Sequence, residues 1–150
     1  MRQWATGVTL VTATDAHGPH GMTVSSFTSV SLDPPLILVA LERGARTHQM
    51  VEDVGHFAVV ILRAEQRELA ERFAGGVDDG GSRFEGVAYD LTAGGAPVPS
   101  DPLAYLDCQV VEAHPAGTHT VFLGLVTDGR AARAGSPLLY YNRNYRRLAG

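Results

Sequence analysis

The chain has 150 residues, a formal net charge of −4 and 45% hydrophobic residues, so we expect one domain over residues 1–150 with its own core. Its basic residues are scattered, which excludes the basic footprint of a nucleic-acid-binding protein. No stretch is long and apolar enough to span a membrane, and no signal-peptide pattern opens the chain. A single cysteine, Cys108, cannot form an intrachain disulfide, and we therefore expect a cytoplasmic protein.

The first third of the chain predicts a β-hairpin. Residues Thr6–Thr14 alternate between apolar and polar side chains, as a half-buried strand does, and Asp15–Gly21 has the composition of a turn. The following stretch, Gly21–Pro35, is expected to be a second strand that Asp33-Pro34-Pro35 breaks. Its middle is rich in hydroxyl groups, which belong to Thr23, Ser25, Ser26, Thr28 and Ser29.

This hydroxyl-rich stretch has two interpretations. Short hydroxyl groups and backbone N–H groups on a rigid β-sheet suit a ligand with many acceptor atoms, such as a phosphate or a heteroaromatic ring with carbonyls. Threonine is also common on the polar face of an ordinary strand, and most such faces bind nothing. Composition alone favours the ordinary strand.

Buried strands and short helices alternate in the middle of the chain. The wholly apolar run Leu36–Leu41 predicts a strand that is buried on both faces, and Phe57–Leu62 predicts another. Between them, apolar residues at helical spacing predict a short helix from Thr47 that ends at Gly55.

A second helix is expected over Ala64–Ala74, with the ion pairs Arg67–Glu71 and Glu68–Arg72 on its outer face. The glycine-rich segment Ala74–Arg83 follows it. This segment lacks the Lys-Ser/Thr that ends a phosphate-binding P-loop, so we interpret it as a flexible connection.

The last third predicts three more strands, after a turn-rich segment over Gly94–Pro102. They are Leu103–His114, Thr118–Asp128 and Leu138–Tyr141. In the first of them Cys108 shares a face with apolar residues, so we expect a small buried side chain. Six or seven strands with two short helices, and no βαβ alternation, are typical of an antiparallel sandwich or barrel.

The histidines are the main candidates for chemistry. His17 and His20 could form a loose metal pair, although two solvated turn residues are the favoured interpretation. His48 and His56 flank the first helix as surface or boundary residues. His119 lies at the corner between two long strands, either as a turn residue or as an imidazole at the rim of a barrel. Motifs of serine hydrolases and zinc proteases are missing, so a cofactor would supply any reactivity.

An ordered series of segments resembles the flavin reductase-like family, short NAD(P)H:flavin oxidoreductases that serve two-component monooxygenases. The segments are ATGVTLVTA, HGMTVSSFTSVSLDPPL, RGARTH, RFAGG, GTH and PLLYYNRNYRRL. The resemblance implies a mainly β fold, a Greek-key split β-barrel (the FMN-binding split barrel) with two or three short helices. It also implies a homodimer with flavin at the dimer cleft, while the scattered charge and the lack of a long apolar run already argue against nucleic acid or a membrane as a partner.

The resemblance further implies the residues that bind flavin, either FMN or FAD. Those implied around the isoalloxazine ring are Thr23, Val24, Ser25, Ser26, Phe27, Ser29 and Val30. Those implied at the phosphate are Ala45, Arg46 and Thr47, next to Gly44 where many relatives have serine. Phe73 and Ala74 are implied at the distal part of the flavin.

For the hydride donor, NADH or NADPH, the resemblance implies His119 beside the nicotinamide, and Arg143 and Tyr145 as residues that help to hold the dinucleotide. Many relatives have aspartate where this chain has Thr118. The implied activity is hydride transfer from nicotinamide C4 to flavin N5, with reduced flavin passing to a separate monooxygenase. The alternatives are a non-catalytic flavin- or haem-binding barrel and a pyridoxamine-phosphate-oxidase-like enzyme.

Overall fold

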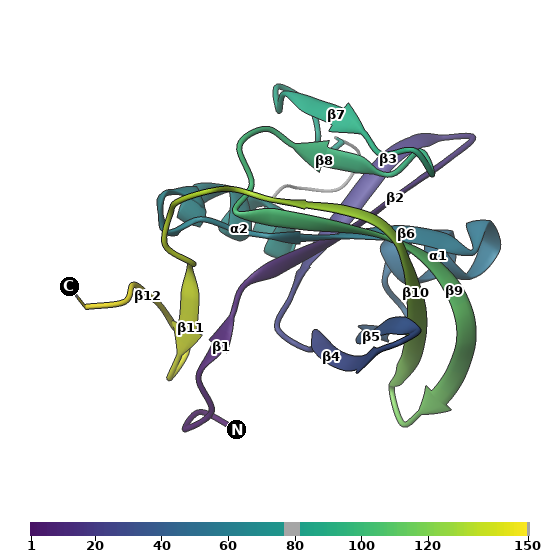
Figure 1. Ribbon diagram of the computed structural model, residues 1–150, viewed down its shortest axis with the longest axis horizontal. Helices are drawn as coiled ribbons and strands as arrows, with labels where there is room; N and C mark the ends of the chain where they lie inside the picture. Colours follow the sequence, from purple (N-terminus) through teal and green to yellow (C-terminus); the bar gives the residue numbers. More distant parts are fainter. Residues whose placement is uncertain (77–81, 150) are drawn as a thin grey trace.

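A computed structural model describes residues 1–76 and 82–149, and its fold is mainly β (Figure 1). The strands are β1 (Thr6–Gly7), β2 (Thr9–Asp15), β3 (Gly18–Val24), β4 (Thr28–Leu32), β5 (Pro35–Glu42), β6 (His56–Ile61), β7 (Tyr89–Leu91), β8 (Pro97–Pro99), β9 (Ala104–Ala116), β10 (His119–Ala131), β11 (Leu139–Tyr141) and β12 (Asn144–Arg146). The helical segments are α1 (Arg46–Val54), the 3₁₀ turn η1 (Ala64–Gln66), α2 (Arg67–Glu71) and the π-helical turn η2 (Arg72–Gly76).

Seven strands form one antiparallel sheet in the order β3-β2-β6-β9-β10-β5-β4. Strands β3 and β4 follow each other in the chain but stand at opposite edges of this order, so residues 25–27 cross from one edge to the other. The Ser26 hydroxyl donates to the Ala40 carbonyl of β5 at 2.8 Å and ties this crossing to the far side of the sheet. The sheet is therefore curled into a barrel that stays open between β3 and β4, which confirms the expected split barrel.

The two faces of the central strands bury different clusters, because side chains alternate along a strand. Val11, Phe57 and Val59 point into the barrel and pack with α1 and the inner faces of β5 and β10. Leu10 and Val60 point outwards and pack under α2, η2 and the hairpin of β7 and β8. In Figure 1 this hairpin lies above β2 and β6, whereas β4 and β5, at the other end of the curled sheet, lie below them.

Several boundaries differ from the sequence-based expectation. The first predicted strand is interrupted at Val8, where β1 leaves the large sheet to pair with β11. The hydroxyl-rich stretch is two strands rather than one, because the chain leaves β3 after Val24. The turn before it is shorter than predicted, since Asp15 already pairs with Gly18. Strand β5 is fully buried on one face only, and Leu36, Leu38 and Ala40 on its other face are half-buried.

Two small sheets were not predicted. Strand β7 was not predicted, and it forms a hairpin with β8, which lies in the segment Gly94–Pro102 that was expected to be turns. Strand β12 lies in the basic tail and pairs with β11. On α2 the predicted pair Arg67–Glu71 forms at 2.9 Å, whereas Arg72 donates to the carbonyls of Arg83 and Glu85 rather than pairing with Glu68. Among the described residues, no helix is long and apolar enough to cross a membrane.

Candidate functional site

A pocket of about 620 Å³ lies along the edge strand β3. Its walls come from four places: β3 itself, the turn between β5 and α1, η2 with Arg83, and the small sheet of β11 and β12. Because β3 is an edge strand, alternate backbone N–H and C=O groups point away from β2 and have no partner strand on that side. A volume of this size suits a drug-sized or cofactor-sized ligand.

The first turn of α1 forms the positively charged end of the pocket. Ala45 precedes the helix in an extended conformation and gives it no side-chain cap, so the first backbone N–H groups are not capped by a side chain. Arg46 is exposed and lines the pocket, and Thr47 beside it is buried. An uncapped helix start with an arginine fits an anionic group such as a phosphate.

His20 and Arg83 also line the pocket, and sequence reasoning did not place them there. His20 lies on β3, and a hydrogen bond of 2.8 Å joins its Nδ1 to the Thr47 hydroxyl. The Arg83 guanidinium donates to the carbonyls of Gly21 and Phe73, so it closes η2 onto β3. Burial lowers the pKa of Arg83 from its usual value. Sequence reasoning missed Arg83 because it is the last residue of the glycine-rich segment Ala74–Arg83, which we interpreted as a flexible connection. Residues 77–81 of that segment lie outside the described residues.

The structure brings nine of the predicted site residues to this pocket. They are Thr23, Val24, Ser25, Ala45, Arg46, Thr47, Phe73, Ala74 and Tyr145. Thr23 also donates its hydroxyl to the Ala70 carbonyl at 2.6 Å, which fixes β3 against α2. Ser25 is exposed at the end of β3, so its hydroxyl is accessible from the pocket.

The other predicted site residues do not line the pocket. Ser26 bonds to Ala40, and Phe27 packs against the barrel core. Ser29 and Val30 are exposed on β4. His119 is exposed at the corner of β9 and β10 and bonds through Nδ1 to the Thr118 hydroxyl at 2.9 Å. Arg143 lies in the turn between β11 and β12 with a positive φ of 63°.

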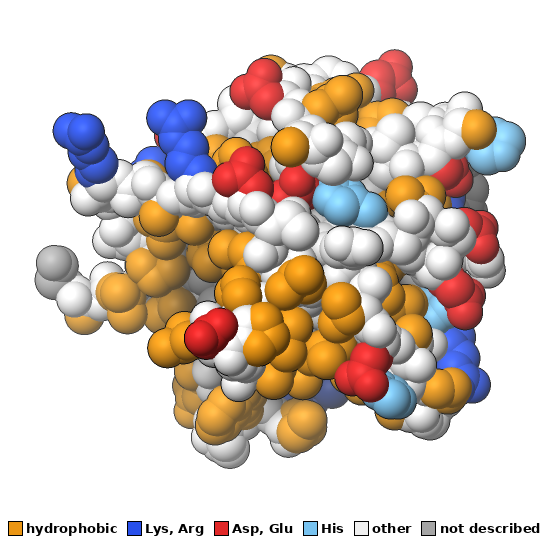
Figure 2. Space-filling model, turned by 45° about the vertical axis from the view of Figure 1, so that its right-hand side comes forward, with side chains coloured by type: hydrophobic (Ala, Val, Ile, Leu, Met, Phe, Trp, Pro, Cys, Tyr) orange, Lys and Arg blue, Asp and Glu red, His pale blue; other side chains and the backbone are white. Residues whose placement is uncertain are grey.

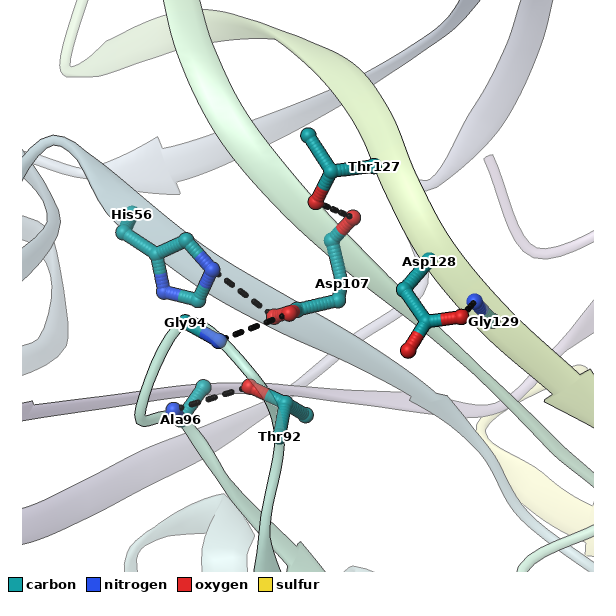
Figure 3. Close-up of polar contacts among 8 residues, drawn as sticks. All are labelled: His56, Thr92, Gly94, Ala96, Asp107, Thr127, Asp128 and Gly129. Atoms are coloured by element: carbon teal, nitrogen blue, oxygen red, sulfur yellow. Dashed lines mark hydrogen bonds and ion pairs between the residues drawn. The ribbon is translucent and has the colours of Figure 1, made fainter.

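Of the two histidines expected as surface or boundary residues, His48 is internal and His56 lies at the boundary. His48 is buried, and its Nε2 bonds to the Thr120 hydroxyl at 2.7 Å, which joins α1 to β10. His56 is half-buried, and its Nε2 lies 2.7 Å from a carboxylate oxygen of Asp107, whose other oxygen accepts from the Gly94 backbone N–H (Figure 3). These residues hold a helix and a loop on the sheet.

The described part of the chain contains no group of three histidine, cysteine or acidic side chains that could hold a metal ion. His17 is exposed in the turn between β2 and β3, whereas His20 points to Thr47, so the two do not form a pair. Cys108 is buried, as its alternation predicted, and burial raises the pKa of its thiol to about 12.

The model of the flavin reductase-like domain matches residues 1–149. The chain belongs to the flavin reductase-like family. It is 42% identical over 149 residues to the actinorhodin polyketide dimerase of Streptomyces coelicolor, covering 99% of this chain and 82% of that one. It is 36% identical over 148 residues to the reductase component of 4-hydroxyphenylacetate 3-monooxygenase from Thermus thermophilus, covering 99% and 92%.

Among solved structures, the chain is similar to the NADH:FAD oxidoreductase SgcE6 of Streptomyces globisporus in complex with NAD and FAD fragments. The TM-score is 0.91 and the identity 37%, over 98% of this chain and 87% of the other. The Streptomyces coelicolor relative is named a polyketide dimerase, whereas the other two proteins are named as a monooxygenase reductase component and an NADH:FAD oxidoreductase. These findings confirm the family and the fold that the sequence implied, and they do not favour a haem-binding barrel or a pyridoxamine-phosphate oxidase.

Proposed function

We propose that this flavin reductase-like protein is an NAD(P)H:flavin oxidoreductase whose flavin binds in the pocket along β3. One observation supports this proposal above the others. The same pocket contains the open edge of β3 and the start of α1, which has no side-chain cap. When bound, the two ligands supply the chemistry, which is hydride transfer from nicotinamide C4 to flavin N5. The chain itself supplies binding, orientation and exclusion of water.

Each wall of the pocket has a part in this proposal. The free N–H groups of β3 and the Ser25 hydroxyl would donate to the oxygen and nitrogen acceptors of the flavin ring, and they would stabilise negative charge that develops there. Arg46 and the α1 N-terminus would hold a phosphate. Phe73 is buried behind the pocket and gives it an apolar wall.

We also propose a homodimer, because four of the implied site residues are exposed away from this pocket. Ser29 and Val30 on β4, His119 at a strand corner, and Arg143 in a turn would complete a site at a subunit cleft if a second copy brought them to the pocket. Apolar side chains gather over the lower part of the surface in Figure 2, and the exposed ones on β4 are Val30 and Leu32. Such a patch is typical of an interaction surface.

The proposed role is to pass reduced flavin to a separate monooxygenase in the cytoplasm, with residues 1–150 acting as one domain. The name of the Thermus thermophilus relative, a monooxygenase reductase component, supports this partner. A single free cysteine fits a reducing compartment.

The test is oxidation of NADH and of NADPH, followed by nicotinamide absorbance, with FMN, FAD or no flavin added. We expect rapid oxidation that depends on added flavin, and the rates identify both preferences. Flavin binding without oxidation of either nucleotide would contradict the reductase proposal and leave a flavin-binding barrel.

Replacement of His119 tests the nicotinamide side of the site. Because the side chain is proposed to position nicotinamide from the corner of β9 and β10, His119→Ala should raise the KM for NAD(P)H several-fold and change the KM for flavin little. Steady-state kinetics with each substrate varied in turn gives both values. Unchanged nicotinamide kinetics would remove His119 from the site.

A further inference from the structure

We propose that His20 is a phosphate-binding residue of the β3 pocket and that it takes up a proton when the phosphate of a flavin binds there. This inference rests on the proposed function and adds a residue and a proton to it. His20 on β3, Arg46 at the start of α1 and Arg83 after η2 all line the same pocket.

One ring nitrogen of His20 is fixed and the other is available. Nδ1 bonds to the hydroxyl of buried Thr47 at 2.8 Å, so the position of the imidazole follows that of α1. Nε2 has no hydrogen-bond partner within residues 1–76 and 82–149. Within that part of the chain it is open to solvent, because the buried side-chain atoms that lack a partner there do not include it. A neutral imidazole that accepts from Thr47 at Nδ1 carries its proton on Nε2 and can donate it to an anion in the pocket.

Burial and the neighbouring positive charges favour the neutral form of His20 in the free protein. Burial, followed by the positive charges of Arg83 and Arg46, lowers the pKa of His20 to about 4, against a smaller opposite effect of Asp15 on β2. The pocket also contains Glu42 from β5, and Tyr140 and Tyr145 from β11 and β12. The net charge is positive at the end of the pocket that Arg46 and Arg83 line, and a phosphate would bind at this end.

A bound phosphate would favour the protonated form of His20 instead. Its negative charge neutralises the field of Arg46 and Arg83 and favours the imidazolium, and a nearby opposite charge moves a pKa by about 1–3 units. The pKa of His20 then lies higher in the complex than in the free protein, so binding takes up a proton. The affinity for a phosphorylated flavin therefore rises as the pH falls from the higher pKa of His20 in the complex towards its lower pKa in the free protein.

The experiment compares the wild-type protein with His20→Gln, which keeps a donor but cannot become charged. Dissociation constants for FMN, for FAD and for riboflavin, which has no phosphate, are measured by flavin fluorescence between pH 5 and pH 7. His17→Gln, an exposed histidine three positions away in the same hairpin, is the matched control. We expect the ratio of the His20→Gln constant to the wild-type constant to grow about tenfold from pH 7 to pH 5 for FMN and FAD. For riboflavin, and for His17→Gln, the ratio should stay constant.

A second measurement needs no variant. Calorimetry of wild-type protein in buffers with different ionisation heats counts the protons taken up, and FAD is the ligand because its diphosphate does not itself titrate in this range. We expect roughly half a proton or more per FAD near pH 5.5 and close to none for riboflavin.

The outcomes are distinct. A constant ratio for all three ligands with no proton uptake, in a protein that still oxidises NAD(P)H with flavin, overturns the role of His20 and leaves the proposed function in place. An equal pH effect on riboflavin also overturns it, because the phosphate would not be the cause. Absence of both flavin binding and nucleotide oxidation overturns the proposed function itself.

Discussion

At the scale of single residues, three buried or half-buried histidines each join two parts of the fold. His20 links β3 to α1 through Thr47, and His48 links α1 to β10 through Thr120. His56 contacts Asp107, which also holds the loop at Gly94 (Figure 3). In each case the partner comes from a segment far away in the chain, so no local pattern marks these histidines as internal.

The contact of His56 with Asp107 predicts that Gly94→Ala destabilises the protein. A Cβ atom at position 94 would overlap the His56 ring, and Asp107 beside it is 1% exposed. Moving the ring away would leave this buried carboxylate short of a partner, at a cost of about 1–3 kcal/mol. Urea unfolding of the variant measures the change.

A double-mutant cycle separates this clash from any general effect of alanine in the loop. In a His56→Ala background the ring is gone, so Gly94→Ala should then cost less than about 0.5 kcal/mol. Equal costs in both backgrounds would show that the ring is not the cause.

At the scale of elements, the long strand β10 carries a glycine that the packing requires. A Cβ on Gly124 would lie 2.8 Å from Phe57 Cζ, 3.1 Å from Cys108 Cβ and 3.3 Å from Ile37 Cδ1. Gly124→Ala should therefore overpack the barrel interior and lower the free energy of unfolding by about 1–3 kcal/mol.

Thermal and denaturant unfolding check this prediction against Gly7→Ala, where a Cβ would meet no atom within 4 Å. Adding Phe57→Leu to the Gly124→Ala variant removes the closest contact atom, so part of the lost stability should return. If the second change only adds to the loss, the overlap with Phe57 is not the source of strain.

The sequence predicted the elements whose signals are local. Helix α1 was expected from its apolar spacing, and it ends at Gly55, which adopts the left-handed conformation with φ of 73°. The long antiparallel pair β9 and β10 was expected from two apolar runs around a turn. The hairpin of β7 and β8 was missed, because it has only three residues in each strand and two of the three in β8 are prolines.

The candidate site was predicted in part for the same reason. Residues close together in the chain, such as Ala45, Arg46 and Thr47, carry a motif, and they meet in the pocket. Arg83 and His20 become neighbours of that motif only through the curl of the sheet and the turn of η2, so they could not be inferred from spacing. The hydroxyl-rich stretch was interpreted as a single strand, whereas its residues 25–27 form the crossing between the two sheet edges.

At the scale of the whole molecule, the open barrel leaves β4 as an exposed edge with apolar side chains. Leu32 is 91% exposed and Val30 is 47% exposed, and the bulge at Val30 interrupts the register with β5. An exposed edge of this kind favours pairing with another chain unless charges protect it. A second copy that covered β4 would bury these side chains and bring Ser29 and Val30 towards a neighbouring pocket, in agreement with the proposed dimer.

This dimer predicts a specific response to charge on β4. The double variant Val30→Asp with Leu32→Asp should be monomeric by light scattering, because two carboxylates would have to be buried for the copies to associate. Its flavin reduction rate should fall about tenfold or more if the second copy completes the site. Leu91→Asp, on β7 far from β4 in Figure 1 and 62% exposed in the native protein, is the control and should leave mass and rate unchanged. A wild-type protein that is already monomeric and fully active would contradict the dimer, and Ser29, Val30, His119 and Arg143 would then have no route to the pocket through a partner.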